Sequence, residues 1–377
     1  MSRFLRKMMD RVMGGRGESS ITVPVMDGAL KPNNYLDRMA ALAVIDQPDN
    51  VVSCGSLVFF SSGSDVFRLE ADNACILLQR ETAAVSFLAI SASGALAIGL
   101  ESGGLHIYGG PHDGKSIGVS GVDRINAPIA AVFQSEDTIL VCNGSAHFSP
   151  SEWRHDLLSH GNSGAVFKID LAKGETKAIA RDLSWPAGIC LVDDLTVLVS
   201  EAWKHRVLRL GNGTNTHYAA LDDLPAYPGR LIRSSTGGYW LTLFAVRSQL
   251  QEFVLREPRF LREMMETIEP AYWIAPSLAS GRSFKEPLQS GGVIRLGIHK
   301  PWAPTRSYGL VTRLDPEFQP VWSAHSRADG KRHGVTSIAE HNSGVLVTAR
   351  GNDEVLAIAH TALDEPFDLH LSSEAVT

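Results

Sequence analysis

The chain has 377 residues, with 35 Lys and Arg against 41 Asp and Glu, a net charge of −6 and 44% hydrophobic residues. This composition excludes an intrinsically disordered chain, and an acidic balance without a long basic block argues against nucleic-acid binding. No stretch approaches about 18 uninterrupted apolar residues, so we expect no membrane-spanning helix.

Residues 1–20 are basic, and charges interrupt their apolar residues, so they lack the continuous apolar core of a secretory signal. Apolar residues recur there near helical spacing, at Phe4, Leu5, Met8, Met9, Val12 and Met13. We expect a short amphipathic helix that docks on the protein's own surface, with membrane contact as the alternative.

Four cysteines, Cys54, Cys75, Cys142 and Cys190, lie in or beside β-like apolar runs, and none forms a C-x-x-C pair. We interpret them as reduced thiols, which are typical of a reducing compartment. This predicts a cytoplasmic protein.

A weak internal repeat sets the predicted architecture. Each unit has a turn, an apolar β-branched strand, a short loop and an alternating strand, mostly with another apolar segment upstream. Six units contain these strand pairs: 55–61 with 65–69, 94–100 with 104–108, 137–143 with 164–169, 195–201 with 206–210, 238–244 with 308–314, and 343–349 with 354–358. Repeats of roughly 40 residues with four strands each are typical of propeller blades.

We therefore predict an all-β fold, a six-bladed β-propeller over residues 21–365, followed by a C-terminal tail over residues 366–377. An N-terminal strand, for which residues 21–25 are the candidate, would close the ring by pairing into the last blade. A pair of β-sandwiches, or two barrels, is the alternative.

Two units carry insertions between their second and third strands, a loop at 144–163 in blade 3 and a longer segment at 245–307 in blade 5. Apolar residues in the second recur at helical spacing from Leu250 to Ile268, and Pro258 divides them into two helices. Loops at this position emerge on one face of a propeller, so we expect both insertions to cover one mouth of the channel. A dimerisation or surface-packing element is the alternative.

The same topology gathers polar residues at that mouth. The starts of inner strands place Asp49, Ala187, Arg230 and Thr336 there, and the ends of second strands place Ser61, Asn143, Glu201 and Arg350 around the same opening. A ring of inward polar groups suits a metal ion or a polar ligand.

These residues lie in motifs that resemble the strictosidine synthase-like family, within the superfamily of gluconolactonases and paraoxonases. LSWPAGIC at 183–190 with VLVSEAWKHRVLR at 197–209 resembles the family's F-x-N-G-V and E-T-x-x-x-R-I-x-R stretch. LPAYPGRL at 224–231 with GYW at 238–240 resembles L-P-G-x-P-D-N-I and G-x-F-W, and HGVTSIAEH at 333–341 resembles the last-blade V-T-x-V-x-E. QPDN at 47–50 is a looser match to G-P-E-S.

The resemblance implies a Ca²⁺ or other divalent ion on the channel axis in the superfamily's hydrolases. Asp49 and Asn143 match two of its ligand positions, but Ala187 and Gly229 stand where an Asn and an Asp are expected. Since Ca²⁺ takes six to eight oxygen ligands, we expect the two losses to abolish the site unless water and Glu201 substitute. We therefore predict no cofactor, with Ca²⁺ as the alternative.

Strictosidine synthase itself uses a last-blade glutamate to handle protons, and that position holds Thr336 here. A threonine hydroxyl cannot serve as a carboxylate acid or base near neutral pH. We therefore expect no strictosidine synthase activity.

Several polar residues remain as candidates at the predicted site. Arg230 suits a carboxylate or phosphate ligand, or it pairs with Asp49 in the space of the missing metal. Glu201 is either a general base or a structural partner of Arg206. His147 is a candidate for proton transfer, and Tyr227 is a candidate for ligand contact.

The preferred function is hydrolysis of an ester or lactone, with Glu201, Asp49 and His147 as catalytic residues and Arg230, Asn143, Thr336 and Tyr227 as ligand-binding residues. The alternative is a metal-free protein that binds a small anionic ligand without catalysis. A third possibility is a protein-interaction platform on the helices of the second insertion. The sequence contains no P-loop, no HExxH and no GxSxG motif.

Overall fold

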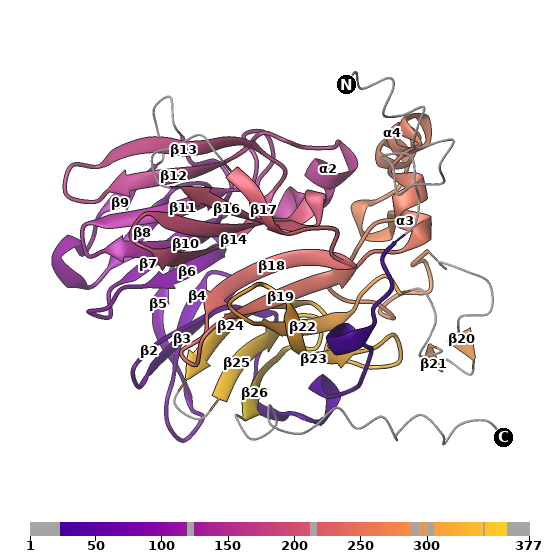
Figure 1. Cartoon of the computed structure of the whole chain (residues 1–377), viewed down its shortest axis with the longest axis horizontal. Coiled ribbons are helices and arrows are strands. Elements are labelled where there is room, and N and C mark those ends of the chain that lie inside the picture. Colours follow the sequence, from indigo (N-terminus) through magenta and orange to yellow (C-terminus); the bar gives the residue numbers. More distant parts are fainter. Residues whose placement is uncertain are drawn as a thin grey trace.

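The computed structural model describes residues 23–118, 124–211, 217–287, 305–341 and 344–359, together with two short strands, β20 (Ile294–Arg295) and β21 (Ile298–His299). Six four-stranded antiparallel sheets are arranged around a central axis, as a six-bladed β-propeller (Figure 1). The predicted fold class is confirmed. The N-terminal segment 1–20 and the C-terminal tail 366–377 lie outside the described residues.

Blades 1 to 5 use their strands in chain order from the axis outward, with the following bounds. Blade 1 has β2 (Pro48–Cys54), β3 (Leu57–Ser62), β4 (Asp65–Leu69) and β5 (Cys75–Arg80), and blade 2 has β6 (Val85–Ile90), β7 (Leu96–Leu100), β8 (Leu105–Tyr108) and β9 (Ser116–Ile117). Blade 3 has β10 (Pro128–Ser135), β11 (Thr138–Asn143), β12 (Gly164–Asp170) and β13 (Glu175–Leu183), and blade 4 has β14 (Pro186–Asp193), β15 (Thr196–Glu201), β16 (Arg206–Gly211) and β17 (His217–Leu221). Blade 5 has β18 (Ala226–Arg233), β19 (Tyr239–Val246), β22 (Gly309–Leu314) and β23 (Pro320–Ser326).

The sixth blade closes the ring with strands from both ends of the described chain. It contains β24 (Val335–His341), β25 (Gly344–Ala349) and β26 (Glu354–Ala359), and β1 (Ala40–Val44) pairs antiparallel with β26 as the outer strand. The expected closing strand at 21–25 was wrong, because residues 23–25 are not in a strand and residues 40–44 take that place. The error arose because both segments are short and apolar, and only pairing with β26 distinguishes them.

Burial within each blade explains the sequence pattern of its strands. The second strands are buried on both faces, as in β25, where every residue is buried, so they are read as continuous apolar runs. The outer strands alternate or face solvent, as in β5 and β17. A blade therefore presents two apolar faces to its neighbours.

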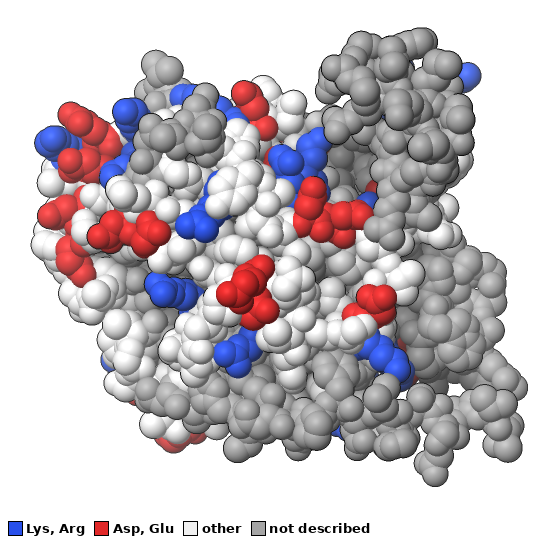
Figure 2. Space-filling model, in the orientation of Figure 1, with Lys and Arg blue, Asp and Glu red and all other residues white. Residues whose placement is uncertain are grey.

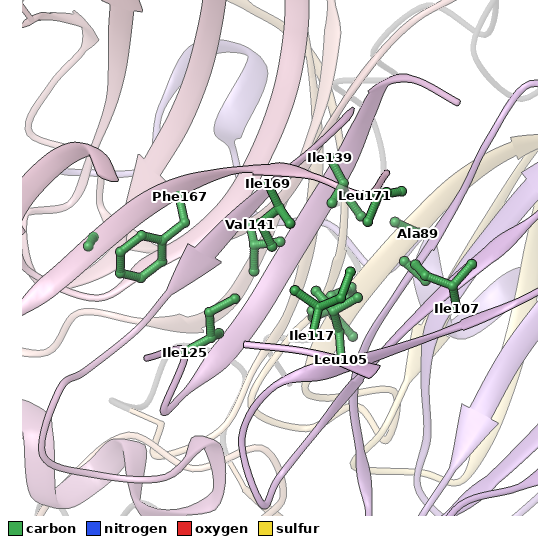
Figure 3. Packing of buried hydrophobic residues seen from close by; sticks show 13 residues of the cluster. Ala89, Leu105, Ile107, Ile117, Ile125, Ile139, Val141, Phe167, Ile169 and Leu171 are labelled. Carbon is green, nitrogen blue, oxygen red and sulfur yellow. The ribbon is translucent and has the colours of Figure 1, made fainter. Parts of the chain in front are cut away.

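The core consists of apolar clusters between adjacent blades. Leu105 and Ile107 of blade 2 share one buried cluster with Val141 and Phe167 of blade 3, and Ile139 in the same cluster is fully buried (Figure 3). Equivalent clusters join each remaining pair of neighbouring blades in the described chain, including blades 6 and 1. Because every blade is buried between two others, the ring holds its inner strands at defined positions around the axis.

Both insertions form helices on the same side of the propeller (Figure 1). The first, expected as a loop, contains α2 (Trp153–Leu158), and the second contains α3 (Gln249–Val254) and α4 (Pro258–Thr267), which begins at the proline that separates the two helices. Leu158 of α2 shares one buried cluster with Val254, Leu261 and Trp273 of the second insertion. The two insertions therefore pack against each other.

On the face shown in Figure 2, acidic and basic side chains are interspersed, with no broad basic area among the described residues. No helix within the described ranges is long and apolar enough to span a membrane.

Replacing Ile139 with alanine should lower the free energy of unfolding by about 2–5 kcal/mol, because the change leaves a cavity between blades 2 and 3. Urea denaturation measures the loss. The matched control is Ile76→Ala in the outer strand β5, where the side chain is 48% exposed and the loss should stay near ~0.5 kcal/mol. Equal losses at the two positions would contradict the described core.

Candidate functional site

A pocket of about 140 Å³ lies at the mouth of the channel, on the side of the insertions. Its polar lining includes Asp49, Ser86, Arg230, Thr336 and Arg350. Strand ends from all six blades reach it, and both insertions contribute, through Pro150 and Trp153 from the first and Leu278 from the second. We call it the mouth pocket.

Arg230 projects from β18 and joins three other blades. Its Nη1 donates to the carbonyl of Ala187 at 2.9 Å, and its Nη2 donates to Oδ1 of Asn50 at 2.7 Å and to the carbonyl of Ser86 at 3.1 Å. The guanidinium therefore occupies the part of the channel on which the inner strands of blades 1, 2, 4 and 5 converge.

Glycines allow the two inner strands beside this arginine, β14 and β18, to approach each other closely. A Cβ on Gly188 would lie 2.3 Å from the carbonyl oxygen of Gly229 and 3.0 Å from the Cα of Arg230. The hydroxyl of Ser200 donates to the carbonyl of Gly229 at 2.6 Å. The glycines at 188 and 229 thus let β14 and β18 approach each other closely next to the backbone of Arg230.

The acceptors that hold Arg230 are neutral, and no carboxylate lies within ion-pair distance of it among the described residues. Burial lowers the pKa of its guanidinium, while the negative charge of Asp49 opposes that shift. Arginine nevertheless remains protonated in proteins. Arg230 is therefore a positive charge on the axis without a charged partner, and two of its five N–H groups make no hydrogen bond in the described structure.

Arg230 also separates the mouth pocket from the opposite end of the channel. A second cavity, of about 390 Å³, lies beyond it and is lined mainly by apolar residues of the inner strands, such as Leu88 and Ile189. Arg230 contacts both spaces, so it forms the floor of the mouth pocket.

Asp49 does not pair with Arg230, which was one predicted alternative. Its Oδ2 lies 3.3 Å from Nη1 of Arg350, and its Oδ1 accepts the backbone N–H of Asn50 at 2.7 Å. Asn50, with a positive φ of 57°, turns its own amide towards Arg230 and Ser61 instead. The mouth pocket therefore has a neutralised Asp49–Arg350 pair at its side and a single charge at its floor.

Asn143 and Glu201 end second strands as expected, but both lie outside the mouth pocket lining. Oδ1 of Asn143 accepts the backbone N–H of Ala127 at 2.7 Å, and Oε1 of Glu201 accepts that of Ser184 at 2.7 Å. Oε2 of Glu201 also pairs with Nε of Arg206 at 2.6 Å, which was the structural alternative. Each side chain ties its strand end to the start of the neighbouring inner strand.

The remaining predicted residues are divided between the pocket and its surroundings. Thr336 lines the pocket, with its hydroxyl 3.2 Å from that of Thr348. Tyr227 is fully buried behind the pocket wall, 5.9 Å from Phe244 between ring centroids, and does not line the pocket. His147 is exposed on the first insertion and also lies outside the lining.

An apolar wall faces the polar floor. Trp153 and Phe244 meet edge to face with their ring centroids 5.7 Å apart, and Ile129, Trp185 and Leu278 complete the wall. Trp153 belongs to the first insertion, so this wall exists only because the insertion folds back over the mouth.

Sequence reasoning missed Asn50, Ser86 and Trp185. Ser86 lies in the inner strand of blade 2, β6, and its buried hydroxyl has no hydrogen-bond partner in the described structure. Ser86 is the second residue of an inner strand and therefore lies near the mouth, and this position could have identified it as a pocket residue. For Asn50 and Trp185 the signal was the family motif that contains each of them.

The residues present do not fit a divalent cation. Ala187 and Gly229 offer no side-chain oxygen, the oxygen of Asn143 is bonded to a backbone amide, and the guanidinium of Arg230 lies on the axis. Within the described ranges, no group of three or more His, Cys, Asp or Glu could hold a metal ion. A cation would also be repelled by the charge of Arg230.

Comparison with known proteins agrees with this fold. The profile of the strictosidine synthase family matches residues 130–211, which cover blade 3 from β10 onward and most of blade 4. Adipocyte plasma membrane-associated protein from Danio rerio is 26% identical over 176 residues, 41% of this chain and 42% of that protein. The protein STRICTOSIDINE SYNTHASE-LIKE 10 from Arabidopsis thaliana is 26% identical over 131 residues, 34% of this chain and 35% of that protein. The chain is therefore similar to the strictosidine synthase family over blades 3 and 4.

Solved structures extend the likeness over most of this chain, at the level of the fold alone. A gluconolactonase from Xanthomonas campestris superposes with a TM-score of 0.53 at 12% identity, over 84% of this chain and 86% of that one. The calcium-binding protein regucalcin from Agrobacterium tumefaciens superposes with a TM-score of 0.50 at 11% identity, over 82% and 85%. Each curated relative, by contrast, is matched over less than half of its length.

Replacing Glu201 with glutamine should lower the free energy of unfolding by about 1.5–3 kcal/mol, because it removes the charge that the buried hydrogen bond from Arg206 requires. Urea denaturation gives the loss. Glu175→Gln, an exposed carboxylate on β13, is the control and should change little. A fully stable Glu201→Gln protein would contradict the structural role and leave Glu201 free for the predicted catalytic one.

Proposed function

We propose that this protein binds a small organic anion in the mouth pocket, through Arg230 and without a divalent metal. The observation that carries the proposal is a half-buried guanidinium on the propeller axis that faces the pocket and has only neutral partners. A charge in this situation is stabilised by an anion, and arginine can bind a carboxylate through two parallel hydrogen bonds.

Two further features support an anion with an apolar body. The unpartnered hydroxyl of Ser86 lies on the strand whose carbonyl accepts from Arg230, so one ligand carboxylate can accept from both side chains. The wall of Trp153, Trp185 and Phe244 offers aromatic faces to the rest of the ligand. Pockets with apolar walls and a few convergent polar groups are typical of small-molecule sites.

The test is a comparison of matched ligands. Phenylacetate and 3-phenylpropionate should bind in calorimetry at least about tenfold more tightly than their uncharged amides. Adding Ca²⁺ or a chelator should leave the affinities unchanged. Equal affinity for acids and amides, or binding that requires a divalent cation, would contradict the proposal.

Arg230→Gln should remove the preference for the acid over the amide, because it removes the charge and keeps a polar side chain. The matched control is Arg233→Gln, three residues further along β18, where the arginine is exposed and donates to the carbonyl of Val192. Thermal unfolding establishes that each variant is folded, and the comparison of acid with amide in the unchanged protein stands independently of both variants.

Hydrolysis of an ester or lactone is the second candidate, favoured by the carboxylate of Asp49, which lines the same pocket as Arg230. Asp49 could accept a proton from water, next to a positive charge that stabilises a developing oxyanion. Glu101 also lines the pocket, but its carboxylate accepts the backbone N–H of Ser151. Glu201, Asn143 and His147 do not line the pocket, so this proposal keeps Asp49 and Thr336 from the predicted set.

If the protein hydrolyses such substrates, Asp49→Asn should lower kcat by about 10²-fold or more, because an amide cannot accept the proton. A chromogenic panel of esters and lactones, assayed with a chelator present, measures this. Asp182→Asn, at an exposed position on β13, is the control. Unchanged turnover in Asp49→Asn would remove Asp49 from the reaction, and no turnover in the unchanged protein would leave binding alone.

A cytoplasmic location stays a prediction. The four cysteines are free thiols, two of them fully enclosed between blades, and this is compatible with a reducing compartment.

A further inference from the structure

A further cavity, of about 470 Å³ and distinct from the one below Arg230, opens directly from the mouth pocket towards the insertions. We call it the vestibule. The two spaces share several lining residues, among them Trp153, Leu278 and Arg350. The mouth pocket alone is smaller than the roughly 300–1,000 Å³ of typical small-molecule sites, so a ligand of ordinary size would extend into the vestibule.

The charged lining of the vestibule is predominantly basic. Among the described residues it contains four arginines, Arg154, Arg282, Arg306 and Arg350, and two glutamates, Glu101 and Glu286. Both glutamates bond to backbone amides. Glu101 accepts from Ser151 at 2.9 Å, and Glu286 accepts from Gly281, Arg282 and Ser283 at 2.8, 3.0 and 3.2 Å.

Two of these arginines lie next to each other. Nη1 of Arg154 donates to the carbonyl of Pro270 at 2.9 Å, and Nη2 of Arg306 donates to the carbonyl of the next residue, Ala271. Arg154 comes from the first insertion and Arg306 from the end of the second, so the packing of the two insertions brings the like charges together.

The charge on Arg306 is poorly compensated. Its side chain is 5% exposed, its nearest carboxylate oxygen, on Glu286, is 3.9 Å away, and its Nε has no hydrogen-bond partner in the described structure. Burial lowers the pKa of Arg306, and burial together with the neighbouring Arg306 lowers the pKa of Arg154 to about 10. A buried donor without a partner and two adjacent cations both indicate an anion that is bound between them.

We propose that Arg154 and Arg306 bind a phosphate or sulfate group of the ligand in the vestibule. A doubly charged tetrahedral oxyanion suits two adjacent guanidiniums better than a single carboxylate does, because each guanidinium can present two parallel N–H groups to it. The rings of Trp153 and Tyr272 line the same space and can contact an aromatic or apolar body next to the oxyanion.

Taken with the proposed function, on which this step rests, the substrate class becomes a small amphipathic molecule with anionic groups at both ends. One end lies on Arg230 at the floor of the mouth pocket, and the other lies between the insertions. The apolar body spans the wall that includes Trp153, which lines both spaces.

The experiment measures binding of inorganic phosphate, sulfate and phenyl phosphate to the full chain by calorimetry, at fixed ionic strength in chloride. Phosphate and sulfate should bind in the millimolar range, and phenyl phosphate at least about tenfold more tightly if the aromatic wall contributes. Equal affinity of phenyl phosphate and phosphate would limit the site to the free ion and overturn the assignment of an aromatic or apolar ligand body.

Arg306→Gln and Arg154→Gln should each weaken phosphate binding by about tenfold or more. Arg259→Gln, at an exposed arginine of α4 in the same insertion, should leave it unchanged. Arg154→Gln provides a second test should Arg306→Gln fail to fold. Undiminished phosphate binding in both variants, or no phosphate binding in the unchanged protein, would overturn the oxyanion site.

The two proposals fail separately. Arg230 lines the mouth pocket and not the vestibule, so carboxylate binding at the floor and phosphate binding between the insertions are measured at different residues. If the protein binds phosphate but binds carboxylates no better than their amides, the proposed role of Arg230 is wrong and the vestibule site stands. If it prefers carboxylates to amides but does not bind phosphate, only the vestibule site is wrong.

Discussion

Pairing of β1 with β26 makes six blades into a closed ring, and the arrangement of the site depends on that closure. Each blade is covered by apolar clusters on both faces, so no blade can shift without exposing buried surface against two neighbours. The inner strands are therefore held around one axis, and residues more than a hundred positions apart in the chain, such as Asn50 and Arg230, come within hydrogen-bond distance.

Arg230 lies where these inner strands converge. Its guanidinium is held by two backbone carbonyls and one side-chain amide from three different blades, so its position is set by the ring as a whole. Neutral acceptors fix the geometry of the guanidinium and leave its charge uncompensated. This combination distinguishes the axis of this propeller from one that carries oxygen ligands for a cation, because it places a positive charge there.

The insertions add what the ring cannot provide. Blade ends alone would leave a shallow polar opening, whereas Trp153 and Leu278 from the insertions enclose it with apolar surface. Their contact with each other, through Leu158, Val254 and Leu261, also brings Arg154 beside Arg306. The apolar wall and the basic vestibule therefore both depend on the contact between the two insertions, which are about a hundred residues apart in the chain.

The repeat in the sequence determined the blade count, the places of both insertions and the break between α3 and α4 at Pro258, because alternation and turn residues act locally and leave a pattern that can be read directly. The positions of Asp49, Arg230 and Thr336 at the mouth followed from the same repeat.

The partners of these residues were decided by the tertiary structure. Arg230 donates a hydrogen bond to Asn50 and does not pair with Asp49. Glu201 and Asn143 accept hydrogen bonds from backbone amides. The direction of a side chain at a strand end depends on the local backbone angles and on close packing between blades, which the sequence pattern does not specify. The closing strand at 40–44 was likewise decided by pairing across the ring, which no local pattern specifies.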